Sequence, residues 1–187
     1  ASDQTGIELL LDRWIRGKLA EMGVARGERP EPQMRQDLDR MLSQTVMGSP
    51  DTQTTTAIQR LARSILENRV SGALIDQQAL QWLKGDAVIF PELKKVGIVE
   101  RASDLNAFQR LKAVLVYLRK VLGYKGFFVA FDEGTRTGSF KRASAKERQA
   151  VENLLTLINE SSRPGGFDGT MFLYAATPDF RQEVVSR

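Results

Sequence analysis

Two short, unbroken apolar runs near the carboxyl end place the strongest constraint on how this chain can fold. GFFVAFD spans 126–132 and TMFLYAA spans 170–176. Each run is too short for a buried helix and is rich in aromatic or β-branched residues, which is typical of a fully buried strand. A helical pattern lies between them, with Leu155 and Ile158 on its expected inner face. The order strand–helix–strand predicts a βαβ unit with parallel strands.

The residues before about 122 predict helices, because apolar residues recur there at helical spacing. Ser49 or Asp51 is the expected N-cap of one helix, and Asp76 caps a short helix that stops at Gly85. Ser103 is expected to open a long helix. Its predicted buried face consists of Leu105, Phe108, Leu111, Leu115, Leu118 and Leu122. The fold class is therefore expected to be α/β and helix-rich.

The composition excludes several kinds of chemistry. The 187 residues contain no cysteine and no histidine. Disulfides, thiolate nucleophiles, histidine or cysteine zinc sites and histidine acid–base catalysis are therefore excluded. No apolar run reaches the roughly 18–20 residues that would span a bilayer, and no signal peptide is visible, so we expect a cytoplasmic protein without a membrane partner. A net charge of +4 is too small to argue for nucleic-acid binding.

Two adjacent carboxylates, Asp132 and Glu133, end the first apolar run. Ligands of open α/β sheets bind beyond the carboxyl ends of the strands, so this pair lies where chemistry is expected. Neighbouring carboxylates repel each other unless a cation such as magnesium compensates. One acid then holds the metal ion through water, and the next orients or deprotonates an attacking water. Four or more apolar residues followed by Asp-Glu form the Walker B pattern of P-loop NTPases; the alternative is that both acids only shape a turn.

Thr177 follows the second run, where ATPases of the additional-strand class carry a polar residue that senses the γ-phosphate. Its alternative role is a Thr-Pro turn that opens a final helix. No G-x-x-x-x-G-K-[ST] phosphate loop occurs in the sequence. Two parallel strands also make a poor sheet, since a nucleotide-binding domain needs about five. We therefore expect a fragment: one partial P-loop NTPase domain over 1–187, helical over about 1–122 and strand-bearing over about 123–187, with the Walker A loop upstream.

Three segments carry a resemblance to a known family. They are LQWLKGDAVIFPELKKVGI at 80–98, LGYKGFFVAFDE at 122–133 and FLYAATPDF at 172–180. Over roughly 74–187, and weakly before that, the chain resembles the ATP-binding proteins of bacteriophage-exclusion (BREX) defence systems. The resemblance implies a P-loop ATPase fold of the additional-strand type.

That resemblance also implies ATP and magnesium as ligands. By the same match, Asp132 is the magnesium-associated acid, Glu133 the catalytic base and Thr177 the sensor residue. The chain departs from the pattern in two ways. It has no counterpart of the phosphate-binding lysine, so the chain alone is not expected to bind ATP, and Gly134 stands where a larger residue is expected.

A basic loop follows the two acids and contains Arg136, Lys141 and Arg142. These side chains have the charge to reach the ATP of a neighbouring subunit, as an arginine finger does, or to contact DNA phosphates. The alternative is a solvated loop. The expected partners are therefore ATP, other defence-system proteins or further copies of the chain, and DNA.

Two other functions compete with the ATPase interpretation. The first is a degenerate ATPase-like scaffold or binding module that holds protein or DNA without turnover. The second is a stand-alone magnesium phosphohydrolase, which needs more than two neighbouring acids. Asp168 or Asp179 would have to supply the further carboxylate.

Overall fold

A computed structural model describes residues 6–25, 28–46, 49–101, 103, 106–132, 145–163 and 166–175. Seven helices and two strands lie in this described part of the chain, which is helix-rich as expected. The chain divides into two compact units, Ala1–Gly123 and Tyr124–Arg187, called the helical unit and the strand unit below. Within the described ranges, no helix is both long and apolar enough to cross a bilayer.

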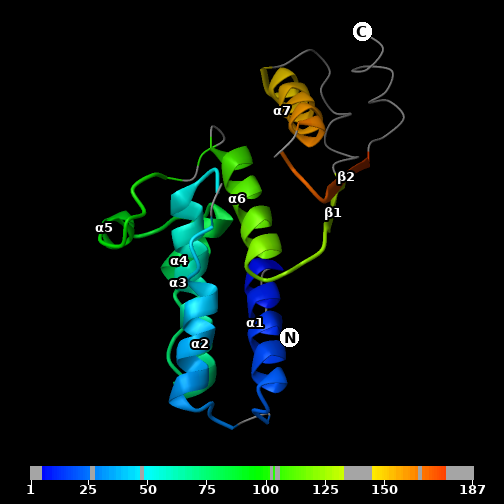
Figure 1. The fold of residues 1–187 in the computed structure, drawn as a ribbon. Coiled ribbons are helices and arrows are strands. Elements are labelled where there is room, and N and C mark those ends of the chain that lie inside the picture. The colour runs from blue at the N-terminus through cyan, green and yellow to red at the C-terminus, as the bar shows by residue number, and fades with distance from the viewer. Residues whose placement is uncertain are drawn as a thin grey trace. The chain divides into compact units, whose positions relative to one another are not determined.

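The helical unit is organised around one central helix. α3 (Thr52–Ser71) packs against α1 (Gly6–Glu21), α2 (Pro32–Leu42), α4 (Gln77–Lys84) and α6 (Ala107–Lys120), and α5 (Phe90–Lys94) is a short helix after α4 (Figure 1). Apolar rows from these helices form the core. Its side chains with no exposed surface include Leu11, Ile15, Leu38, Leu42, Ala57, Ile58, Leu61, Ala62, Ala113 and Tyr117.

The predicted caps form where the sequence placed them. The Asp51 carboxylate accepts a hydrogen bond from the Gln53 amide at 2.9 Å and begins α3. The Asp76 carboxylate accepts one from the Ala79 amide at 2.9 Å and begins α4. Gly85 ends α4 with a φ of 82°, a left-handed conformation that favours glycine.

The prediction that α6 opens at Ser103 is wrong, because α6 begins at Ala107. The Asn106 side chain accepts a hydrogen bond from the Ser103 amide at 3.0 Å and donates one to the Arg101 carbonyl at 2.9 Å. These bonds hold a turn in front of the helix. An asparagine that bonds nearby backbone groups competes with helix formation in this way.

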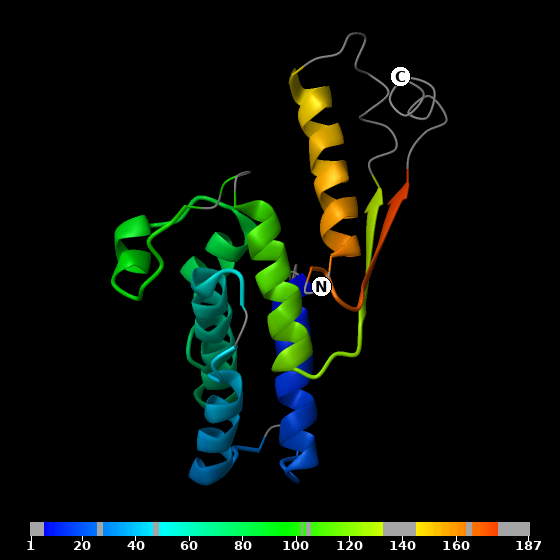
Figure 2. The ribbon, with the colours of Figure 1, turned by 45° about the horizontal axis from the view of Figure 1, so that its top comes forward.

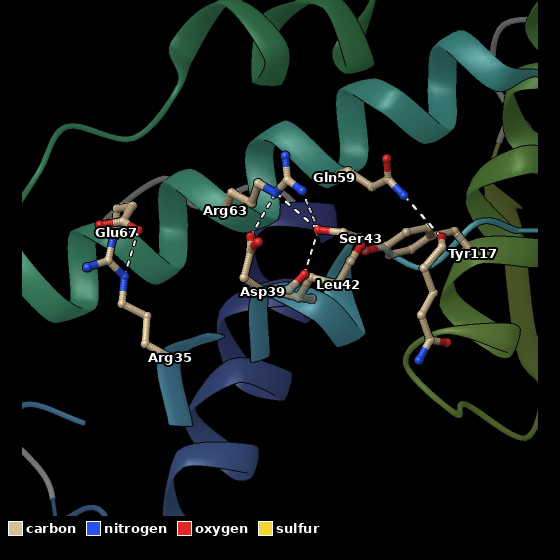
Figure 3. Close-up of polar contacts among 9 residues, drawn as sticks. Arg35, Asp39, Leu42, Ser43, Gln59, Arg63, Glu67 and Tyr117 are labelled. Carbon is tan, nitrogen blue, oxygen red and sulfur yellow. Dashed lines mark hydrogen bonds and ion pairs between the residues drawn. The ribbon is translucent and has the colours of Figure 1, made fainter. Parts of the chain in front are cut away.

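Polar contacts join the exposed sides of α2 and α3. Arg63 donates from Nε to the Asp39 carboxylate at 2.8 Å, and Arg35 donates to the Glu67 carboxylate at 2.5 Å (Figure 3). Both arginine side chains are about half exposed, at 51% and 48%. Such pairs contribute at most about 1 kcal/mol each, so the apolar core rather than these ion pairs holds the two helices together.

A buried tyrosine joins α6 to the end of α2. The Tyr117 hydroxyl has no exposed surface and donates a hydrogen bond to the Leu42 carbonyl at 2.7 Å (Figure 3). Burial raises the pKa of Tyr117 above the usual value, because the phenolate would lose its solvation, and the nearby positive charge of Arg63 offsets only part of this effect.

We expect Tyr117→Phe to lower the free energy of unfolding by about 1 kcal/mol at neutral pH, because the Leu42 carbonyl loses its donor. Because the pKa of Tyr117 is raised in the folded state, the stability of the protein also depends on pH. Above about pH 10 the unfolded chain releases the Tyr117 proton while the folded chain keeps it, so stability falls by up to about 1.4 kcal/mol per pH unit. The Tyr117→Phe variant should not show this loss of stability at high pH, because phenylalanine has no proton to release. Urea unfolding from pH 7 to 11 measures both effects, and parallel curves for the two proteins would contradict the prediction.

The strand unit contains the predicted strand–helix–strand order. β1 (Phe127–Asp132) precedes α7 (Ala145–Ser162), and β2 (Thr170–Ala175) follows it. The strands pair in parallel, with Phe127 opposite Thr170 and Asp132 opposite Ala175, which confirms the predicted parallel pair. α7 runs alongside the two strands (Figure 2).

The prediction that both strands are fully buried is wrong. One face of the sheet is half-buried and carries Phe127, Val129, Phe131, Phe172 and Tyr174. The opposite face is exposed: Phe128, Met171 and Leu173 expose 60%, 62% and 46% of their surfaces. The sequence of a strand in a parallel sheet is usually a continuous apolar run, because both faces of such a sheet are normally covered. The described part of the strand unit contains one helix, α7, which covers only one face of the sheet.

The expected inner face of α7 is also partly wrong. Leu155 and Ile158 are 52% and 53% exposed, whereas Leu157 is buried. Helical spacing identifies an apolar side, but a helix beside two strands has too little surface opposite it to bury a wide apolar stripe.

Candidate functional site

The carboxyl edge of the two-stranded sheet is the candidate site. β1 ends at Asp132 and β2 ends at Ala175, and these two residues are register partners in the parallel pair. Adjacent strands lie about 4.8 Å apart, so the carboxyl ends of the two strands lie next to each other. A βαβ unit therefore brings residues more than 40 positions apart in sequence to one edge.

Close backbone approach and aromatic packing fix this pairing. A Cβ added at Gly126 would lie 2.9 Å from the Gly169 carbonyl oxygen, so only glycine allows the strands to begin this close together. The Phe127 amide donates to that same carbonyl at 2.9 Å. Further along, the Phe131 ring lies 6.1 Å from the Phe172 ring, between centroids. These contacts set the register, and the register sets which residues meet at the carboxyl edge.

The structure describes one of the predicted site residues, Asp132, as the last residue of β1. The predicted base Glu133 is its sequence neighbour, and Thr177 follows Ala175 by two positions; both lie outside the described residues. The basic-loop residues predicted to contact phosphates also lie outside them: Arg136, Lys141 and Arg142.

The described residues limit the kind of metal site that this edge can form. No group of three or more acidic side chains that could hold a metal ion occurs among them. A magnesium ion in a nucleotide site needs only one or two carboxylates, because phosphate oxygens and waters complete its octahedral shell. Asp132, the last residue of β1, is a residue of this type at the edge. Its residue type is one that such a magnesium ion takes as a ligand.

Asp168 does not join Asp132, and Asp179, the other acid that the phosphohydrolase alternative names, lies outside the described residues. Asp168 precedes β2, whose first residue, Thr170, pairs with the first residue of β1. Asp132 is at the other end of the same pair of strands. At about 3.3 Å per residue, a six-residue strand separates the two ends by about 16 Å. A metal cage that combines these two acids is therefore excluded.

A buried arginine in the helical unit was missed by the sequence interpretation. Arg110 on α6 is only 9% exposed. Its Nη2 donates to the Trp82 carbonyl at 2.5 Å, and its guanidinium carbon lies 4.0 Å from the centroid of a Trp82 ring. Burial lowers the pKa of Arg110, and the Asp51 carboxylate opposes this effect. The signal was its position: Arg110 shares a helical row with Ala113 and Tyr117, both without exposed surface.

Comparison with known proteins identifies the family. The family model of the BREX system ATP-binding protein BrxC/D matches residues 1–185. The match confirms the resemblance predicted for roughly 74–187 and extends it through the helical unit. Comparisons with curated proteins and with solved structures find no match. Because the model covers nearly all of the sequence, the chain belongs to the BREX system ATP-binding protein BrxC/D family.

Proposed function

We propose that this chain carries the Walker B and sensor segments of an ATPase that serves phage defence in a BREX system. Membership of an ATP-binding family supports the nucleotide as ligand. The observation that carries the proposal is the parallel register that pairs Asp132 with Ala175. This register places the carboxyl ends of the two strands side by side, and nucleotide sites of α/β sheets form at such an edge.

In the proposed mechanism, Asp132 would hold the magnesium ion, and Glu133 accepts a proton from the attacking water. The Thr177 hydroxyl donates a hydrogen bond to the γ-phosphate or to that water. Magnesium would supply charge neutralisation for the phosphates. The phosphate-binding loop is supplied by sequence outside these 187 residues, so the chain alone is the water-activating half of the site.

The basic loop extends the proposal to partners. Arg136, Lys141 and Arg142 follow the two acids closely in sequence. A cation near this edge stabilises the charge that develops on the transferred phosphoryl group, in its own subunit or in a neighbour. The proposed partners are further copies of the chain, other proteins of the defence system and DNA phosphates. The cysteine-free composition agrees with a cytoplasmic location.

A calorimetric titration of Mg-ATP tests the proposal. The two proteins compared are this chain and the parent protein extended upstream through the presumed phosphate loop. We expect binding by the extended protein and none by the chain alone, because backbone amides and a lysine of that loop make most phosphate contacts. Binding by neither protein would overturn the ATPase proposal.

A degenerate ATPase-like scaffold is the second candidate. The exposed sheet face with Phe128, Met171 and Leu173 favours it, since exposed apolar patches mark surfaces that another element or protein covers. A P-loop domain would cover the same face with its further strands and helices. The titration separates the two candidates, because the scaffold predicts no magnesium-dependent nucleotide affinity in the extended protein.

A further inference from the structure

A cavity of about 420 Å³ lies in the helical unit, far along the chain from the acidic strand end. It lies between the first turn of α3, the last turn of α4 and the first half of α6. Its lining includes Thr54, Leu83, Lys84, Arg110, Leu111 and Val114. Cavities of about 300–1,000 Å³ with apolar walls and a few convergent polar groups are the usual form of small-molecule sites.

Arg110 brings a buried positive charge to this cavity. Its one recorded hydrogen bond among the described residues runs from Nη2 to the Trp82 carbonyl. Its Nε is buried and has no acceptor among those residues. A guanidinium has five N–H donors, so most of the hydrogen-bonding capacity of Arg110 remains for another acceptor.

Two cations, Arg110 and Lys84, line the cavity. Lys84, whose side chain is 41% exposed, adds a second cation and pairs loosely with Asp86 at 3.7 Å. The Asp51 carboxylate opposes part of the charge of Arg110, and its two oxygens accept hydrogen bonds from the Gln53 amide and the Thr54 hydroxyl. Among the described residues, no carboxylate lies within ion-pair distance of Arg110.

We infer that this cavity binds a small organic anion. The anionic head, a phosphate or a carboxylate, takes the N–H groups of Arg110 and the ammonium of Lys84. The apolar body lies against Leu83, Leu111 and Val114. Arginine is suited to this role because its planar guanidinium can donate two parallel hydrogen bonds to the oxygens of a phosphate or a carboxylate. The inference is independent of the proposed ATP site, because every lining residue belongs to the helical unit.

The two tryptophans of the chain provide a test with an internal control. Neither tryptophan lines the cavity, but Trp82 stacks on the lining residue Arg110, whereas Trp14 donates its indole N–H to the Leu122 carbonyl. The full chain is titrated at constant ionic strength with phenyl phosphate, benzoate, inorganic phosphate and phenol, and the two indole ¹H–¹⁵N signals are followed.

We expect phenyl phosphate or benzoate to shift the Trp82 signal saturably while the Trp14 signal stays in place. The stronger of the two identifies the preferred head. Phenol, which lacks the charge, and inorganic phosphate, which lacks the apolar body, should each bind at least about tenfold more weakly. The absence of a saturable Trp82 shift with both organic anions overturns the inference. So does a phenol affinity equal to theirs.

Variants connect the binding to the two cations. Lys84→Ala, at a partly exposed position, should raise the Kd of the stronger anion about tenfold. Arg110→Lys keeps the charge but loses the planar fork, and should weaken binding to a similar degree. The matched control is Lys95→Ala, which removes a 66% exposed cation outside the cavity and should leave the Kd unchanged. Equal Kd values for Lys84→Ala and Lys95→Ala would also overturn the inference.

Discussion

A Glu133→Gln variant of the intact parent protein is expected to bind Mg-ATP normally and to hydrolyse it at least about 100-fold more slowly. Glutamine keeps the size of the side chain and its hydrogen-bonding ability but cannot accept a proton from the attacking water. Asp132, the proposed ligand of the metal ion, is unchanged in this variant, so the nucleotide affinity should change little. Single-turnover hydrolysis measures the chemical step, and calorimetry measures the affinity.

Glu152→Gln is the matched control for this experiment. Glu152 is an exposed residue of α7 in the same unit, so the substitution makes the same change of charge and shape at a residue to which no role in the site is assigned. It should leave the hydrolysis rate within about twofold. A Glu133→Gln protein that hydrolyses ATP as fast as the Glu152→Gln protein would remove the catalytic role of Glu133. The ATP site itself would then still be tested by the titration with the extended protein.

Local signals in the sequence were enough to predict most of the helical unit. Asp51, Asp76 and Gly85 each act through their own side chain or backbone conformation, and each begins or ends a helix as predicted. The parallel pairing of β1 with β2 was also predictable, since a helix between two short apolar runs requires a crossover connection. These features depend on residues that are close in sequence or on simple topology.

Features that depend on a distant partner were only partly predictable. Arg110 and Tyr117 lie on the buried side of α6 because the Trp82 and Leu42 carbonyls accept their hydrogen bonds. The sequence does not show which groups accept these hydrogen bonds, so Arg110 was not expected to be buried in the helical unit. The exposure of Phe128 is a second case, since an apolar residue in a strand does not reveal whether anything covers it.

The candidate site was predictable only as a position in the topology. The pairing of Asp132 with Ala175 follows from the strand order and the length of the two apolar runs. The geometry of Glu133 and Thr177 does not follow from these features, because both residues come after the strands and lie outside the described residues. The Glu133→Gln experiment therefore tests what neither the pattern nor the fold determines.

Leu61→Ala is expected to cost the helical unit about 2–5 kcal/mol of unfolding free energy. Leu61 has no exposed surface and lies on α3, the helix against which α1, α2, α4 and α6 pack. The substitution removes apolar contacts and leaves a cavity where four neighbouring helices cannot all move inward. Chemical denaturation followed by tryptophan fluorescence measures the loss. Both tryptophans of the chain, Trp14 and Trp82, lie in the helical unit, so the signal reports on that unit.

Leu9→Ala on α1 makes the same chemical change at a surface position, because Leu9 is 40% exposed. It should cost about 1 kcal/mol or less, since water fills the space that the side chain leaves. The difference between the two variants isolates the contribution of burial at the centre of α3. Equal losses would mean that α3 is not the packing centre of the helical unit, and that the cavity lined by Thr54 and Arg110 lacks the rigid wall that a specific site requires.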